Sequence, residues 1–176
     1  MADFQTKVNI APALGLPGQQ ISTAVAYTSI NYVSDGTVAA GSFAFADPAD
    51  AGKGLAHKAY SKVASNGRLL GFVARVNSGV IGTPFVPASN AYGEGQNITI
   101  AIRGQFLLEV PASANPTEGQ SVLCEPTTGA ITFGDAGTAN DTGWIVHLPQ
   151  GMSTASEGDI VIIENYGVQA TKAAGA

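Results

Sequence analysis

The hydrophobic pattern of the chain consists of short runs of β-branched and aromatic residues, separated by turns that contain glycine or proline. The most regular run is NITIAIRGQFLLEV, residues 97–110. Its isoleucines, at positions 98, 100 and 102, alternate with Thr99, Ala101 and Arg103. Successive side chains of a strand point to opposite faces, so this alternation predicts a long strand with one apolar face. Gly104 interrupts the run and predicts a bulge or bend.

The same criteria predict strands along most of the remaining chain. They are AVAYTSINYV (24–33), TVAAGSFAFA (37–46, interrupted at Gly41), a hairpin of SVLCEP and AITFG around Thr127-Thr128-Gly129, GWIVHLP (143–149) and DIVIIENYG (159–167). Asn66-Gly67 favours a type I′ turn and predicts a second hairpin within residues 55–76. A helix from Leu55 to Ala64 is the alternative, because alanine and lysine are good helix formers. We expect the apolar faces of these strands to form one core.

A Glu-Gly pair recurs before three apolar runs, at Glu94-Gly95, Glu118-Gly119 and Glu157-Gly158. Glycine supplies the positive φ that a tight turn needs, and the polar neighbours keep the turn in water. No histidine, lysine or second acid accompanies these glutamates at a catalytic spacing in the sequence. We therefore interpret the three pairs as turns between strands.

The two ends of the chain differ from the middle. Residues 1–22 carry two prolines and widely spaced apolar side chains, which predicts an extended N-terminal arm. Residues 23–168 are expected to form a single β domain, and residues 169–176 a flexible tail. The candidate partner-binding residues are the apolar side chains of the arm: Phe4, Val8, Ile10, Leu14 and Leu16.

Composition narrows the class of protein. Of the 176 residues only 12% are charged, while 22 are glycine and 9 are proline, which favours short strands over long surface helices. The net charge of −5 argues against nucleic-acid binding. We expect no membrane span, because no run of 18 apolar residues occurs. The single cysteine, Cys124, and the absence of a secretory signal fit synthesis in a reducing cytoplasm.

Candidate chemistry is sparse, and we expect neither an enzyme nor a cofactor. His57 and His147 lack a metal-ligand companion at close spacing; the first is expected to be solvated, and the second to face solvent or to make one structural hydrogen bond. Cys124 is expected to be a buried thiol. The pairs of acids that could serve a glycosidase lie in loops rich in glycine, alanine and proline: Asp47 with Asp50, Asp135 with Asp141, and Glu157 with Asp159.

The order of several segments resembles the head decoration, or structural cement, proteins of tailed bacteriophages. The segments are VNIAPALGLPGQ in the arm, GSFAFAD (41–47), GFVAR (71–75), IRGQFLLEVP (102–111), EGQSVLCEPTTGAIT (118–132), GWIVHLP and DIVIIENYG. The resemblance implies an all-β fold, a β-barrel or tulip-like sandwich with an extended N-terminal arm. It further implies a homotrimer that binds the outer surface of the mature phage head and clamps neighbouring subunits of the major capsid protein. Assembly would take place in the host cytoplasm.

The sequence also allows two other interpretations of the function. One is a carbohydrate- or receptor-binding β-module of a phage tail fibre, and the other is another minor structural subunit of the virion. Modules that bind sugars usually expose clustered aromatic side chains, whereas the only tryptophan, Trp144, lies in an apolar strand where core packing is expected.

Overall fold

The fold is almost entirely β-structure, as the sequence pattern predicts. The computed structural model describes residues 14–21, 27–50, 52–60, 67–76 and 90–166. Its elements are β1 (Thr28–Ser34), β2 (Phe43–Ala46), a short 3-10 helix (Pro48–Asp50), β3 (Leu55–Ala56), β4 (Arg68–Val73), β5 (Asn97–Glu109), β6 (Ser121–Cys124), β7 (Ile131–Gly134), β8 (Asp141–His147) and β9 (Ile160–Asn165). Among the described residues no helix is long and apolar enough to cross a membrane.

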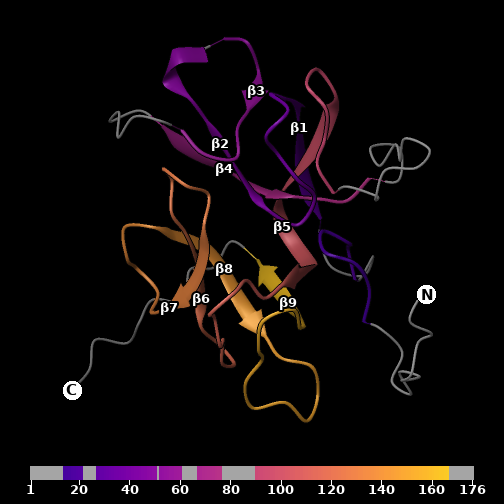
Figure 1. The fold of residues 1–176 in the computed structure, drawn as a ribbon, viewed down its shortest axis with the longest axis vertical. Coiled ribbons are helices and arrows are strands. Elements are labelled where there is room, and N and C mark those ends of the chain that lie inside the picture. Colours follow the sequence, from indigo (N-terminus) through magenta and orange to yellow (C-terminus); the bar gives the residue numbers. More distant parts are fainter. Residues whose placement is uncertain (1–13, 22–26, 51, 61–66, 77–89, 167–176) are drawn as a thin grey trace, which may run out of the picture.

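The strands form one curled, mainly antiparallel sheet, a half-barrel, and β5 runs through both of its parts. The hydrogen-bonded order is β2-β4-β5-β9-β8-β6-β7, with β1 beside the first half of β5 and β3 parallel to β1. In Figure 1, β1 to β4 lie in the upper part and β6 to β9 in the lower part, with β5 passing from one to the other. β5 exchanges β1 and β4 for β9 near Gly104. Gly104 has a φ of 129°, and the pairing of β5 with β1 shifts register just before it, so the predicted bulge or bend is confirmed.

The prediction of a single core is wrong, because the buried side chains divide into two clusters. Ile98 and Ile100 belong to the cluster of the upper part, whereas Phe106 and Leu108 of the same strand belong to the cluster of the lower part. Ala101, on the opposite face of the first half, already belongs to the same cluster as Phe106. The pairing with β1 skips Ile102, and this extra residue moves the even-numbered side chains of β5 from one cluster to the other. Ile102, just before the bend, is 37% exposed.

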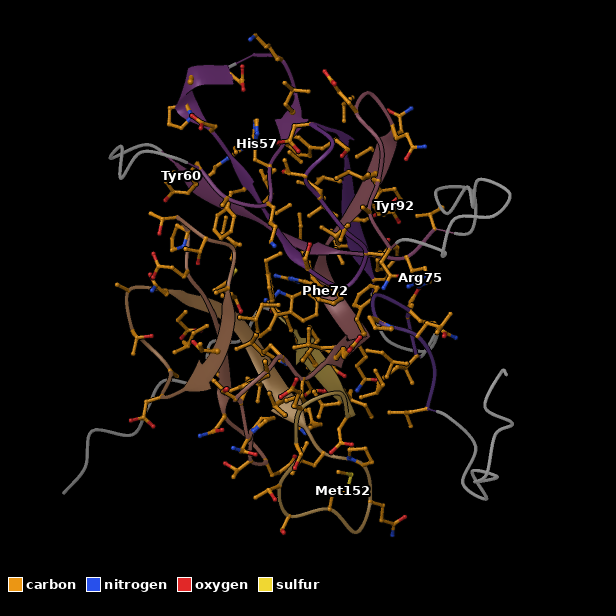
Figure 2. The ribbon with its side chains drawn as sticks, in the orientation of Figure 1. His57, Tyr60, Phe72, Arg75, Tyr92 and Met152 are labelled. Carbon is orange, nitrogen blue, oxygen red and sulfur yellow. The ribbon has the colours of Figure 1, made fainter. Side chains whose placement is uncertain are left out.

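The lower cluster is held together by aromatic side chains from several strands. The Trp144 side chain is 1% exposed, and its ring contacts those of Phe43, Phe72 and Phe106 at centroid distances of 5.7–6.4 Å. Figure 2 shows Phe72 between the two parts of the molecule. The expected core role of Trp144 is therefore confirmed.

The hairpin predicted around Asn66-Gly67 is not found among the described residues. β3 pairs with β1, while β4 pairs with β2 and β5. Gly71 explains why β4 takes this place: a side-chain Cβ there would lie 2.4 Å from the carbonyl oxygen of Ala101, so only glycine allows the close approach to β5. The alternative helix is also wrong at its start, since Leu55–Ala56 is a strand. The predicted hairpin of β6 and β7 is confirmed.

One type of turn occurs four times in the described part of the chain and explains the Glu-Gly pairs. It spans residues 16–19, 93–96, 117–120 and 156–159, with sequences LPGQ, GEGQ, TEGQ and SEGD. In each, the third residue is a glycine with φ of 79–82°, and the fourth residue's side chain accepts a hydrogen bond from the first residue's N–H. The prediction that these pairs form turns is confirmed, and the arm contains a fourth copy.

Candidate functional site

The end of the predicted arm lies along β5 of the same chain. Gly18 donates a hydrogen bond to the Leu107 carbonyl (N···O 2.8 Å), and Leu107 donates one to the Gln19 carbonyl (2.9 Å). Ile21 adds a third, from its N–H to the Gln105 carbonyl (3.2 Å). These strand-like bonds cover the outer edge of the second half of β5, and the Leu107 side chain is only 1% exposed. We call residues 16–21 the arm root.

Arg75 holds the arm root from the side opposite β5. The Arg75 guanidinium donates from Nε to the Pro17 carbonyl (3.0 Å), and the Arg75 N–H donates to the Gly18 carbonyl (2.7 Å). A second guanidinium nitrogen reaches the Asn90 side chain (2.6 Å). Figure 2 shows Arg75 on the side of the molecule where the arm root lies. Sequence reasoning missed Arg75, since nothing in its local sequence indicates a partner 58 residues away.

Gly18 and Gly41 pack against each other without room for a side chain. A Cβ on Gly18 would lie 2.8 Å from the backbone nitrogen of Gly41, and one on Gly41 would lie 2.7 Å from the Pro17 ring. Both glycines also have φ above 80°. The arm root is therefore seated by shape as well as by hydrogen bonds.

Apolar side chains are exposed on and around the arm root. Leu14 is 46% and Leu16 is 56% exposed, while the other predicted arm residues, Phe4, Val8 and Ile10, lie outside the described residues. Ile21, Tyr27 and Ile102 are each 37–41% exposed beside the bend of β5. Tyr27 packs against Phe106 there, at a centroid distance of 5.8 Å. This surface could bury apolar area against a partner.

The structure places His147 between two carboxylates, one of which belongs to a Glu-Gly turn. His147 Nδ1 lies 2.6 Å from Glu118, and its Nε2 lies 2.5 Å from Glu164. The contact with Glu164 is a close ion pair without the alignment of a hydrogen bond. Glu118 also accepts the Leu148 N–H (2.6 Å), and Glu164 accepts from Gln105. The expected single hydrogen bond at His147 is therefore confirmed, and the close contact with Glu164 adds to it.

The electrostatics of this cluster favour a protonated histidine. Burial alone lowers the pKa of His147, but the hydrogen bond to Glu118 and the close negative charges of Glu118 and Glu164 outweigh it and raise the pKa above its usual value. The Leu148 N–H and His147 together lower the pKa of Glu118. The group joins the turn before β6 to β8 and β9, which is a structural role.

His57 has a similar arrangement, which overturns the expectation that it is solvated. Its side chain is 14% exposed, and its two nitrogens lie 2.7 Å from Asp35 and 3.2 Å from Asp50. Asp50 also pairs with Lys53 (2.6 Å). The neighbours are 22 and 7 positions away in sequence, so no local motif shows them. The cluster fastens the loop that follows β2 to the turn after β1.

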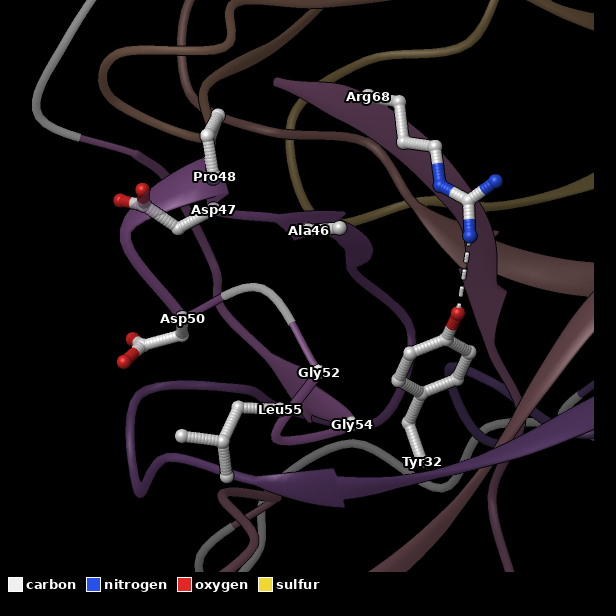
Figure 3. Close-up of a pocket in the computed structure, with 9 residues that line it drawn as sticks. All are labelled: Tyr32, Ala46, Asp47, Pro48, Asp50, Gly52, Gly54, Leu55 and Arg68. Carbon is white, nitrogen blue, oxygen red and sulfur yellow. Dashed lines mark hydrogen bonds between the residues drawn. The ribbon is translucent and has the colours of Figure 1, made fainter. Parts of the chain in front are cut away.

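An open pocket of about 450 Å³ lies beside that loop. Figure 3 shows its lining, with Arg68 donating to the Tyr32 hydroxyl (3.2 Å) and the carboxylates of Asp47 and Asp50 on the loop. Asp47 Oδ1 accepts the N–H of Ala49. The polar groups of the pocket are thus occupied mainly in holding the loop.

No catalytic arrangement is assembled by the described residues. Asp141 accepts the N–H groups of Gly137 and Gly143, and Asp159 accepts that of Ser156, so these acids support turns. The described part of the chain contains no group of three or more metal-binding side chains placed to hold an ion. Cys124 is 2% exposed, and burial raises the pKa of its thiol to about 12, which confirms the expected buried thiol.

The geometry thus defines a class, a β-structural module with an anchored N-terminal segment and exposed apolar side chains beside it. Comparison with known proteins gives the family. A model of the family described as "Structural cement protein (E217 gp24/Pam3 gp6)" matches residues 4–165. This chain belongs to that family of phage structural cement proteins.

The fold is shared with a chain in the solved structure titled "The capsid of Myoviridae Phage XM1". The TM-score is 0.65 at 14% sequence identity, over 95% of this chain and 100% of that chain. A search of curated proteins finds no match. The family assigns this protein a structural role in the phage capsid, and favours a role without enzymatic activity.

Proposed function

We propose that this protein binds the outer surface of the mature phage head and clamps neighbouring subunits of the major capsid protein. The family supports the capsid role. The observation that carries the clamp is the arm root, which is fixed to β5 and Arg75 while Leu14, just before it, and Leu16, its first residue, stay exposed. The body would occupy one site on the shell, and the arm would contact a neighbouring subunit.

The arm can make that second contact because it starts from a fixed point. The 13 residues before Leu14 span at most about 45 Å when extended. Phe4, Val8 and Ile10 lie in this segment, and Leu14 and Leu16 continue the apolar series. A tethered second contact is effectively intramolecular and can raise the overall affinity by about 10²–10⁴.

We further propose a homotrimer on the capsid exterior, assembled in the host cytoplasm. Trimerisation rests on the resemblance to head decoration proteins. An exterior position fits a surface that carries net negative charge, because packaged DNA would repel it. The tail-fibre alternative loses its main candidate for sugar stacking, since Trp144 is buried.

Substitution of the exposed leucines tests the clamp. A Leu14→Ser/Leu16→Ser variant should fold normally but occupy mature heads at least tenfold less at a limiting concentration. Met152→Ser is the matched control, because Met152 is 38% exposed on a loop of the lower part and is not part of the arm. Equal occupancy by wild type, control and double variant would remove the arm from the binding mechanism.

Loss of the whole protein tests the cement role. A protein that binds only the assembled shell stabilises it by about 2.7 kcal/mol per site at a hundredfold excess over Kd. Heads that lack it should assemble, but should release DNA at a lower temperature. Equal release temperatures with and without the protein would contradict the proposal. A hydrolase screen of the pure protein should show no turnover.

A further inference from the structure

Among the described residues, β7 carries a sheet edge that lacks any covering segment along its whole length. The outer edge of β2 is bridged by His57, through reciprocal backbone hydrogen bonds with Phe45. The second half of β5 is covered by the arm root, and the end of β1, at Val33 and Ser34, is covered by β3. β7 pairs with β6 on one side only.

The pairing alternation shows which backbone groups of β7 point outward. Glu125 donates to the Ala130 carbonyl (2.8 Å), so this pair is hydrogen-bonded. Hydrogen-bonded and non-bonded pairs alternate in an antiparallel ladder. Thr132 therefore bonds to β6, whereas the N–H and C=O groups of Ile131 and Phe133 face the open edge. Uncovered edges of this kind pair readily with another strand.

The side chains of β7 leave this edge accessible and uncharged. Thr132 is exposed on the outer face, while Ile131 and Phe133 are partly buried against the lower core cluster. Residues 126–134 carry no charge in a chain of net charge −5. An open groove of about 340 Å³ lies beside the strand, between it and residues 112–115. β7 itself thus has neither the charged residues nor the prolines that natural edge strands use as protection.

We propose that β7 pairs antiparallel with β7 of a second copy of this chain, about a two-fold axis at Thr132. A second copy fits because the edge is self-complementary: Ile131 of each copy lies opposite Phe133 of the other, and the four outward N–H groups meet four outward carbonyls. The two apolar faces become continuous across the junction. Each copy has a net charge of −5, but no like charges oppose each other across the two β7 strands, because residues 126–134 are uncharged.

The contact is small, so it is weak in solution and gains strength where copies are held close together. A stable interface buries about 1,600 Å² in total, which a pair of four-residue strands does not approach. On a shell, tethering of the two copies raises their effective concentration. A two-fold contact cannot lie inside a three-fold trimer, so it joins copies from different trimers if the proposed trimer forms.

A cysteine at the two-fold position tests the pairing in the free protein. Directly opposed residues of a non-bonded antiparallel pair have Cα atoms about 4.5 Å apart, within the range for a disulfide. Thr132→Cys should therefore form a disulfide-linked dimer under mild oxidation, at a rate at least tenfold above that of Ser153→Cys, an exposed position outside β7. The wild type should stay monomeric under these conditions, because Cys124 is buried.

Charge variants provide a second readout that does not depend on oxidation. Thr132→Lys or Thr132→Glu alone places like charges opposite each other and should reduce the dimer fraction of the free protein at high concentration, measured by analytical ultracentrifugation. A mixture of the two variants should restore it, and each variant should keep the wild-type melting temperature. Dimer formation by Thr132→Cys no faster than by Ser153→Cys, or no recovery in the mixture, overturns the proposal. On heads decorated with Thr132→Cys, cross-linking only to the major capsid protein would also overturn the proposal and would assign the edge to a capsid strand.

Discussion

Replacing Gly18 by alanine should release the arm root, and Gly52 provides a matched control. Both glycines have φ near +80° (81° and 85°), so alanine pays the same backbone strain of about 1–2 kcal/mol at either position. Around Gly18 a Cβ would meet three backbone atoms at 2.8–3.1 Å, whereas around Gly52 nothing lies within 4 Å. Only Gly18→Ala therefore adds an overpacking cost, about 1–3 kcal/mol.

Chemical denaturation measures this difference directly. Gly18→Ala should lower the free energy of unfolding by about 1–3 kcal/mol more than Gly52→Ala does. Amide hydrogen exchange locates the effect, because the Leu107 N–H is protected by the Gln19 carbonyl in the arm root. Its exchange should accelerate in Gly18→Ala and stay unchanged in Gly52→Ala. Equal destabilisation of the two variants with unchanged exchange at Leu107 would refute the tight seating of the arm root.

Three further predictions concern the two parts of the body. Ile100→Ala should lower the free energy of unfolding, measured in urea, by about 2–5 kcal/mol, because it leaves a cavity. Ile102→Ala, at a 37% exposed position, should lower it by less than about 1 kcal/mol. Equal losses would contradict the division of β5 into buried and exposed positions. The pKa of His147 is raised on folding, so its contribution to stability should be complete below pH about 6.5 and be lost as the pH rises through the folded value. His147→Gln should therefore flatten the stability profile above pH about 6.5, and a profile unchanged by the substitution would contradict the cluster. Cys124 should react with a thiol reagent only after unfolding, and rapid labelling of the native protein would contradict its burial.

Structural features that depend on neighbouring residues could be predicted from the sequence, whereas contacts between residues far apart in the chain could not. The alternation at residues 97–110 identified β5, and Thr127-Thr128-Gly129 identified the hairpin of β6 and β7. Both signals depend only on neighbouring positions. The glycine of each Glu-Gly pair likewise revealed its turn, but not that Glu118 would reach His147 29 positions away.

The errors have a common physical origin in strand pairing. Asn66-Gly67 is a strong local signal for a hairpin, yet β4 lies between β2 and β5, where Gly71 allows a close backbone approach. Alternation also could not show that β5 serves two cores, because the extra residue at Ile102 appears only in the pairing with β1. Arg75 acquires its role only because the fold brings Pro17, 58 positions away, next to it. The edge of β7 is open only because the fold places no other segment beside it.

Electron cryomicroscopy of phage heads with and without the added protein tests the central claim most directly. Heads assembled without this protein should be incubated with it before and after maturation of the shell. The account predicts density for the half-barrel on the outer surface of mature heads, at repeated lattice positions, with the arm root directed toward a neighbouring major capsid subunit. Mature heads that show no added density on the shell, or density confined to the tail, would contradict it.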